Sequence, residues 1–497
     1  MKFRFFFITP CLLFLSSQLL VAASPQDSDD NSATLQEVFY QTDTVQSVHL
    51  VIAEADQRRM MDALPECIYV PASFRWRNVE FDKVAVRFKG KSSSQPNQKH
   101  KRSYLIRFNK YDKEQRFLGL RRVSFDNGVQ FGSLYSEPII TEILKAEGVK
   151  THRCNYANVY INGNYQGVYV NVERIDETFL ENRFPDASGG LWKNDLGGVG
   201  GDLAFVGSDP MRYAKTFEAK NKAGKNREDL VSFIKTINQV SDGEFATMLE
   251  STIDVDQFFR VTSIMLLSGA FDQLTGWNAH NYYLFHDTQR GCWHYLPWDL
   301  DVGFCETAFG RLRVIDDWNA AWPIPRGRSS PLLDRVISNP ELLNRYRKIA
   351  TEILEDQFQP EQICESIDRK YKLIEPHLAA DPFPKQRATV PGDVGYAQIV
   401  ESMKRFMRRR FSIAEQQLAQ PGRRPAPADN GGNNRQGIPI EFTTRIQQVE
   451  RNAKGMELKM RQLHQIMSKV NSLLKEGEFV EADKLLNRAL ELSGGVN

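Results

Sequence analysis

The chain has 497 residues, with 64 Lys and Arg against 62 Asp and Glu, so its formal net charge is only +2. This near balance argues against a protein built mainly to neutralise nucleic-acid phosphates, and no nucleic-acid partner is expected. The 41% hydrophobic and 25% charged residues are typical of a globular protein rather than a disordered or fibrous one. The length exceeds that of one ordinary domain and indicates about three units.

The N-terminus has the residue order of a secretory signal peptide. Lys2 and Arg4 precede an apolar stretch at 5–20, and small residues follow as far as Ala23. An uncleaved membrane anchor is the alternative interpretation. No other stretch approaches the ~20 apolar residues that span a bilayer. We therefore predict a signal peptide at 1–23 and a secreted or extracytoplasmic mature protein, in the periplasm or at the cell surface, with no membrane contact after cleavage.

The remaining cysteines give little guidance. Five follow the leader segment, and none forms a CxxC pair or a Cys/His ligand spacing, so a structural zinc site is not expected. The count allows one or two disulfides, for which a Cys292–Cys305 pair is only a guess.

The first half of the chain is rich in strand patterns. Residues 24–44 are expected to be a polar, disordered linker. Short runs of β-branched and aromatic residues then predict strands at 45–52, 84–88 and 103–108. A helix is expected at 137–147, where Gly148 stands at the position of a helix stop.

A hairpin and a helix-rich half follow. Asn162-Gly163 between two alternating runs predicts a β-hairpin over 155–161 and 167–173, and the glycine-rich stretch 189–209 is expected to be a loop. Helical periodicity begins near Arg227 and dominates 330–418, interrupted by a second β segment at 281–285 and 293–298. The sequence thus predicts an α+β fold of two lobes, a β-rich N-lobe and a helix-rich C-lobe, spanning 45–415.

The C-terminal region has a different character. Residues 416–440 form a Pro-, Gly-, Arg- and Asn-rich linker, and apolar residues over 446–474 repeat with the 3-4 spacing of a heptad seam. A shorter amphipathic helix follows within 441–492. The alternatives are an α-helical hairpin that folds back on itself, a coiled coil that mediates self-association through 446–474, or docking to a partner.

The densest cluster of chemical groups lies at 271–304. Asp299 and Asp301 alternate with apolar residues, which would place both carboxylates on one face of a strand end. Two neighbouring carboxylates repel unless a cation lies between them, and Mg²⁺ prefers oxygen ligands that it shares with phosphates. Asp272 follows an apolar helix, where a general base could be held. The competing interpretation is a solvated Asp-x-Asp turn.

A second cluster could contact phosphate. Ser92 and Ser93 lie in a Gly-Lys-Ser-Ser-Ser turn, and Lys101 follows in a basic stretch. Glu173 ends a predicted strand and could hold Lys101 toward phosphates, as a carboxylate does for the kinase lysine. Lys193, in the glycine-rich loop, is a weaker candidate. The alternatives are a solvated lysine-rich hairpin, a rim ion pair of Glu173 and a solvated Lys193.

These motifs resemble those of the spore-coat CotH kinases, a family of secreted atypical protein kinases. The resemblance covers roughly residues 45–415 and rests on five motifs in order: RFKGKSS with KRSY, NVYINGNYQGVYVNVERID, GGLWKND, FDQLTGWNAHNYYLF and LPWDLDVGF. It implies a kinase-like fold that binds ATP and Mg²⁺ and phosphorylates Ser or Thr of secreted or cell-envelope proteins.

By motif, the resemblance implies that Asp272 is the catalytic base and that Asp299 is the principal Mg²⁺ ligand. Asn281 would assist near the metal, and Asp301 would support Asp299. Lys101 would contact phosphates while Glu173 holds it. The chain departs from the family where Lys-Gly-Lys-Ser-Ser replaces Arg-Gly-Asn-Ser and where Lys-Arg replaces a double lysine. These departures leave the choice of phosphate-contacting lysine open.

Three other function classes are weighed against the kinase. A non-catalytic surface or matrix protein could keep the fold and assemble through the heptad segment, although the complete set of Asp272, Asn281 and Asp299 argues against it. A sugar-nucleotide transferase acting through the Asp-x-Asp motif would need a preceding βαβ pattern, which the sequence lacks. A phosphatase or nuclease would usually need more clustered His and Asp ligands.

Overall fold

The computed structural model describes residues 34–423, apart from 91–93, 97–100, 129–132, 196, 277–278, 311, 326–327, 384–386, 388 and 391. It also describes 465–470, 472–473 and 479–492. The expected signal peptide and most of the heptad segment 446–474 therefore lie outside the described residues. No helix in the described part of the chain is long and apolar enough to cross a membrane.

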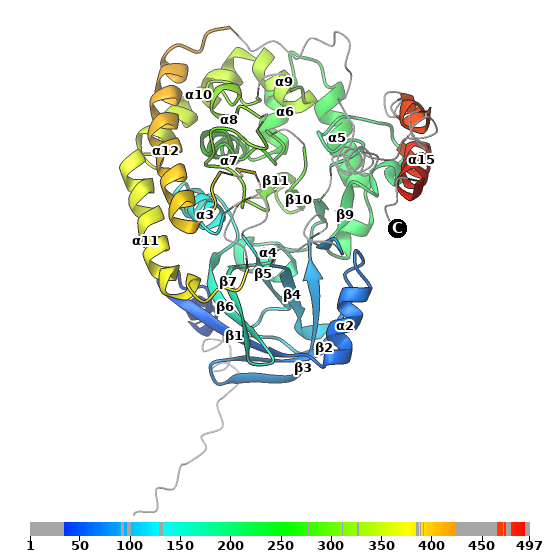
Figure 1. The fold of residues 1–497 in the computed structure, drawn as a ribbon. Helices are drawn as coiled ribbons and strands as arrows, with labels where there is room; N and C mark the ends of the chain where they lie inside the picture. Colours follow the sequence, from blue (N-terminus) through cyan, green and yellow to red (C-terminus); the bar gives the residue numbers. More distant parts are fainter. Residues whose placement is uncertain are drawn as a thin grey trace, which may run out of the picture.

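The first half of the described chain forms a closed β-barrel (Figure 1). Its strand order is β1-β2-β3-β4-β5-β7-β6, and β1 closes the barrel by pairing parallel to β6. The strands are β1 Val45–Val51, β2 Val70–Trp76, β3 Val79–Lys89, β4 Ser103–Arg107, β5 Arg122–Asp126, β6 Cys154–Ile161 and β7 Asn164–Val172. Two helices accompany them, α2 Glu54–Asp62, which packs against β2, and α3 Ser136–Ala146.

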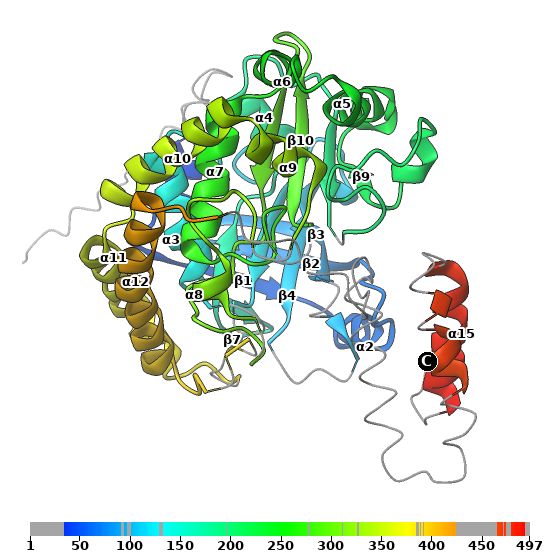
Figure 2. The same cartoon turned by 90° about the horizontal axis from the view of Figure 1, so that it is seen from above.

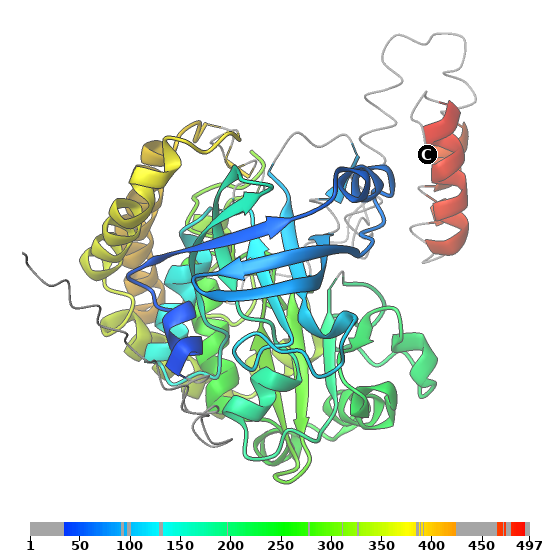
Figure 3. The same ribbon diagram turned by 90° about the horizontal axis from the view of Figure 1, so that it is seen from below.

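Alternation of apolar and polar side chains explains these strands. β2 alternates buried and exposed positions, and an aromatic cluster that includes Phe39, Phe74 and Phe117 fills the barrel interior. Figure 3 looks onto the barrel from below, where the N-terminal strands cross the later ones. The barrel therefore has an apolar core of its own.

A smaller antiparallel sheet and a helical layer make up the rest. The sheet has the order β11-β10-β8-β9, formed by β8 Leu191–Asn194, β9 Phe217–Ala219, β10 Tyr282–Asp287 and β11 Cys292–Pro297. The first helices of this half are α4 Glu177–Arg183, α5 Glu228–Gln239, α6 Phe245–Thr252 and α7 Val255–Ser268. They are followed by α8 Val314–Asp317, α9 Pro331–Ser338, α10 Pro340–Glu355, α11 Pro360–Leu378 and α12 Tyr396–Ala419.

Helix α7 is the centre of this half. Twelve of its 14 residues are buried, and α3, α10, α12 and β11 pack around it. α11 and α12 lie side by side along one flank (Figure 2), and α11 also contacts β7 of the barrel. The helical half is thereby joined to the barrel at a second place besides the chain connection.

The α+β class is confirmed, and so are most of the predicted elements. Gly148 has a φ of +70° just after α3, and Asn162 and Gly163 have φ of +51° and +80° in the β6–β7 hairpin. The description of 189–209 as loop was wrong at Leu191–Asn194, which forms β8 of the smaller sheet. The expectation of a disordered linker at 24–44 was wrong at 34–39, which are helical and bury Phe39 in the barrel core.

Two further predictions concern the cysteines and the C-terminal segment. All five cysteines in the described residues are free thiols, so the guessed Cys292–Cys305 disulfide is not formed. Helix α15 Phe479–Leu492 occupies the position of the predicted short amphipathic helix. The helical hairpin and the coiled coil both stay predictions.

Candidate active site

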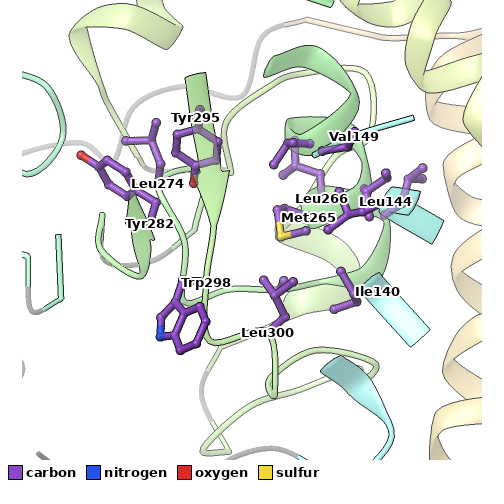
Figure 4. Packing of buried hydrophobic residues seen from close by; sticks show 14 of the residues in the cluster. Ile140, Leu144, Val149, Met265, Leu266, Leu274, Tyr282, Tyr295, Trp298 and Leu300 are labelled. Carbon is purple, nitrogen blue, oxygen red and sulfur yellow. The ribbon is translucent and has the colours of Figure 1, made fainter. Parts of the chain in front are cut away.

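The Asp-x-Asp motif directly follows β11 and alternates as expected. Trp298, Leu300 and Val302 are 1%, 0% and 3% exposed, whereas Asp299 and Asp301 are only partly buried. Figure 4 shows Trp298 and Leu300 in the apolar cluster with residues of α3 and α7. The apolar partners fix the backbone, so the two carboxylates are held on the side away from this core.

The two carboxylates lie in a strongly acidic environment. Burial raises the pKa of Asp299 to about 6, and the neighbouring carboxylates of Asp126 and Glu137 add to this rise against the opposing charges of Lys89 and Lys193. Burial, followed by the charge of Asp299, raises the pKa of Asp301 well above its usual range. Carboxylates that resist ionisation in this way are stabilised by a bound cation.

Asp272 is held by its two neighbours from the start of β10. Its Oδ1 lies 3.2 Å from Nε2 of His280, and Asn281 donates from Nδ2 to its Oδ2 at 3.2 Å. The Asp272 side chain is 26% exposed, and its charge contributes to the raised pKa of Asp301. The structure therefore brings Asp272, Asn281, Asp299 and Asp301 into one electrostatic cluster.

Asn281 and the motif meet because the smaller sheet pairs them. Trp298 donates its backbone N–H to the carbonyl of Asn281 at 3.0 Å, at the end of the β10–β11 ladder. Lys193 on β8 is paired in register with Tyr283 on β10. One end of the sheet thus carries an amide, two carboxylates and a lysine.

Three cations surround the indole ring of Trp298. Its ring centroid lies 4.4 Å from Cζ of Arg174, 5.4 Å from Nζ of Lys89 and 5.5 Å from Nζ of Lys193. Lys89 ends β3 and pairs with Asp126 at the end of β5, so the barrel contributes these two residues. The site consequently lies where one end of the barrel meets one end of the smaller sheet.

Lys193 and Arg174 both have the character of anion-binding groups. Burial alone would lower the pKa of Lys193, but Asp195 and Tyr283 together outweigh it and keep this pKa above its usual range. Arg174 places Nη2 3.4 Å from the Tyr283 hydroxyl, while its Nε and Nη1 are buried without a hydrogen-bond partner among the described residues. Buried guanidinium donors are normally paired, so an acceptor such as a phosphate oxygen would complete this arrangement.

Lys101 lies in a different environment from the one expected. Its Nζ is 2.7 Å from Oδ2 of Asp381, both side chains are 0% exposed, and Nζ also donates to the carbonyl of Val168. Burial lowers the pKa of Lys101, against the opposing effect of Asp381. This lysine joins the barrel to the segment after α11, and the expected pair with Glu173 is not formed.

Glu173 instead binds two arginines. It accepts from Arg153 Nη2 at 2.6 Å and also pairs with Arg183 at the end of α4. Burial opposes its ionisation, but Arg183 and Arg153 hold the pKa of Glu173 below its usual value. The hypothesis that Glu173 holds Lys101 was wrong, because a fully paired carboxylate has no capacity for a third cation.

The other two phosphate candidates, Ser92 and Ser93, lie outside the described residues.

The donor chemistry of the carboxylate pair fits a hard divalent cation, since Asp299 and Asp301 are oxygen ligands with raised pKa values. No group of three or more His, Cys, Asp or Glu in the described chain converges on a metal position. A cation held here would therefore complete its shell with phosphate and water oxygens, as Mg²⁺ commonly does.

Sequence reasoning missed several residues of this cluster. They are Lys89, Asp126, Glu137, Arg174, His280 and Trp298. Lys89, Arg174, His280 and Trp298 fall inside the quoted motifs, so motif membership was an available signal for them. Asp126 and Glu137 had no local signal, since only barrel closure and the packing of α3 bring them here.

The family model and the curated relative confirm the resemblance. A family model described as CotH kinase protein matches residues 86–413. The chain is 25% identical over 291 residues to the Inner spore coat protein H of Bacillus subtilis (strain 168), covering 57% of this chain and 75% of the relative. A crystal structure of the Helicobacter pylori proinflammatory kinase CtkA aligns with 72% of this chain and 98% of that chain, at 11% identity and a TM-score of 0.27.

Proposed function

Because the chain belongs to the CotH kinase protein family, we propose that it is a kinase that transfers the γ-phosphate of ATP, with Mg²⁺, to Ser or Thr of extracytoplasmic proteins. The observation that carries this proposal is that a cluster of cationic side chains and a pair of carboxylates lie side by side at the Trp298 ring. Lys89, Arg174 and Lys193 surround Trp298, and the next residue, Asp299, begins the carboxylate pair.

Each group has a part that its position supports. Asp272, oriented by His280 and Asn281, would accept the proton of the substrate hydroxyl. Asp299 and Asp301 would hold Mg²⁺, with Asn281 near it; bound Mg²⁺ supplies neutralisation of charge on the phosphate oxygens. The transfer then depends mainly on positioning and charge stabilisation, which a few fixed groups can provide.

The assignment of phosphate contacts follows the structure rather than the motif order. Lys193 and Arg174, with Lys89 beside them, are proposed to bind phosphate oxygens because they lie around Trp298, next to Asp299. Lys101 is instead fully buried against Asp381. Trp298 carries the three cations on its ring and keeps them close despite their mutual repulsion, since aromatic faces attract cations. The nearby positive charge also affects Lys220. Burial and the charge of Lys193 lower the pKa of Lys220 to about 8.

Location and partners are part of the same proposal. The leader pattern at 1–23 supports export, and the curated relative is named as a spore coat protein. We therefore propose that the substrate is a secreted or envelope protein and that residues 446–474 provide self-association. Size-exclusion chromatography with light scattering, on the chain with and without residues 441–497, tests the second point.

The direct test measures transfer of labelled γ-phosphate from ATP to the protein itself and to a secreted-protein extract. We compare the unmodified protein with Asp272→Asn, Asp299→Asn and a control, Asp242→Asn, whose side chain is fully exposed. Transfer to Ser or Thr that requires Mg²⁺, survives in the control and is lost in the two site variants supports the proposal. Absence of transfer by the unmodified protein, with no ATP-dependent rise in Tm, would instead favour a non-catalytic binding protein.

A further inference from the structure

The loop 299–304, which carries both aspartates of the motif, has an unusual backbone. Asp299, Gly303 and Phe304 have φ of +59°, +124° and +50°. L side chains rarely adopt such values, and they persist only where surrounding contacts fix the backbone. A Cβ on Gly303 would also lie 2.9 Å from the carbonyl oxygen of Ser268. The loop therefore needs contacts that hold it in this conformation.

Arg387 supplies such contacts from the segment between α11 and α12. It is 1% exposed, and its Nη1 donates to the carbonyls of Gly303 at 3.3 Å and Phe304 at 3.4 Å. Its Nη2 donates to the same Phe304 carbonyl at 3.3 Å. The planar guanidinium fixes the direction of all these donors at once, which a lysine cannot do.

The guanidinium is itself fixed from the other side. Nε donates to Oδ2 of Asp393 at 2.8 Å, and Nη2 lies 3.3 Å from Oγ of Ser402 in α12. Asp393 is 6% exposed, so the ion pair is buried with its arginine. Arg387 thus ties the loop backbone to helix α12 through a paired, immobilised side chain.

The same loop is coupled to the other site residues. Phe304 donates its N–H to the carbonyl of Ser268 at 2.8 Å, at the end of α7, four residues before Asp272. The carbonyl of Asp301 accepts the N–H of Ser133 at 3.0 Å, just before α3. A shift of the loop backbone would consequently change the position of Asp299 and Asp301 relative to Asp272.

We propose that Arg387 is a positioning residue of the phosphotransfer site, which holds the Gly303 and Phe304 carbonyls and thereby fixes Asp299 and Asp301. Its hydrogen bonds go to the loop backbone, Asp393 and Ser402, so we assign it no contact with substrate or cofactor. This inference rests on the proposed function, but the contact it describes can be measured without it. Removing Arg387 should widen the range of loop conformations, so that the two carboxylates are less often arranged for a cation.

The test uses Arg387→Lys and Arg387→Ala, with Arg335→Lys as the matched control. Arg335 also donates to two backbone carbonyls, those of Ile237 at 2.9 Å and Val240 at 2.6 Å, and pairs with Asp242. Its carbonyl partners belong to the end of α5, not to the site. Any general effect of loosening an arginine that holds backbone carbonyls should therefore appear in the control.

Two quantities are measured on the full mature chain. Hydrogen exchange of the peptide that spans 299–305 should accelerate at least tenfold in Arg387→Ala, less in Arg387→Lys, and not at all in Arg335→Lys. The Mg²⁺ concentration for half-maximal phosphotransfer should rise at least tenfold in Arg387→Ala, while KM for ATP at saturating Mg²⁺ changes less than twofold. If Arg387→Ala does not fold, Arg387→Lys carries both comparisons.

The outcomes separate the two proposals. Unchanged exchange in 299–305, or an equal change in the Arg335→Lys control, overturns the positioning role. If the unmodified protein transfers no phosphate, the proposed function fails and with it the catalytic consequence of Arg387. The exchange data then still decide whether Arg387 holds the loop.

Discussion

The buried pair of Lys101 and Asp381 offers the sharpest test of how the structure redistributes the expected roles. The perturbations are Lys101→Met, Asp381→Leu and the double change that combines these two substitutions. In the protein, Nζ and Oδ2 are 2.7 Å apart, neither side chain is exposed, and Oδ2 also accepts the N–H of Val168 at 3.2 Å. Each single change therefore leaves one buried group without its charge partner.

The magnitude follows from this burial. Removing one partner of a buried ion pair typically costs about 3–5 kcal/mol, because the remaining charge stays desolvated. Replacing both partners by apolar residues of similar volume removes that penalty. The free energy of unfolding of the double variant should therefore lie within about 2 kcal/mol of that of the unmodified protein. The two single effects should therefore be strongly non-additive.

Urea unfolding of the four proteins, followed by intrinsic tryptophan fluorescence, measures this cycle. Phosphotransfer is assayed in parallel at a temperature where all four are folded, and Lys101→Met should retain it. Additive single effects below about 1 kcal/mol would refute the buried-pair reasoning. Loss of phosphotransfer in Lys101→Met with unchanged stability would return Lys101 to the role of phosphate-contacting lysine.

Two further predictions follow from the charged groups of the site and the barrel. Burial raises the pKa of Asp299 to about 6, so the folded state keeps a proton that the unfolded chain releases from about pH 4 upward. Without Mg²⁺, the contribution of Asp299 to the free energy of unfolding should therefore fall by at most about 3 kcal/mol between about pH 4 and 6. Thermal melts from pH 4 to 8 should show this slope flattened in Asp299→Asn and stabilisation by Mg²⁺ that grows above pH 6; an identical slope in the variant would contradict it. Glu173→Gln should lower the free energy of unfolding by about 3–5 kcal/mol, since Arg153 and Arg183 lose a buried partner. The KM for ATP should stay unchanged. A variant of normal stability with a raised KM would instead place Glu173 at the nucleotide.

Much of the local structure was predictable because it depends on residues close together in the chain. The Asn162-Gly163 turn needs two positive φ values, which these residues adopt at little cost, and the flanking alternation sets the two strands. The alternation around Asp299 likewise requires only that Trp298 and Leu300 be buried. β8 escaped detection because it is short and lies in a glycine-rich stretch, where its pairing with β10 rather than its own sequence makes it a strand.

The sequence by itself determined the α+β class, the family motifs, and the acidic cluster at Asp299 and Asp301, since each depends on residue order or on side-chain period. Only the tertiary structure decided which cation meets which carboxylate. Lys101 forms an ion pair with Asp381, which is distant in the chain, and Glu173 forms ion pairs with Arg153 and Arg183. The physical reason is that a buried charge needs an opposite charge nearby, and the closed barrel and the packed helices decide which one is near. The spacing of residues along the sequence does not determine this proximity.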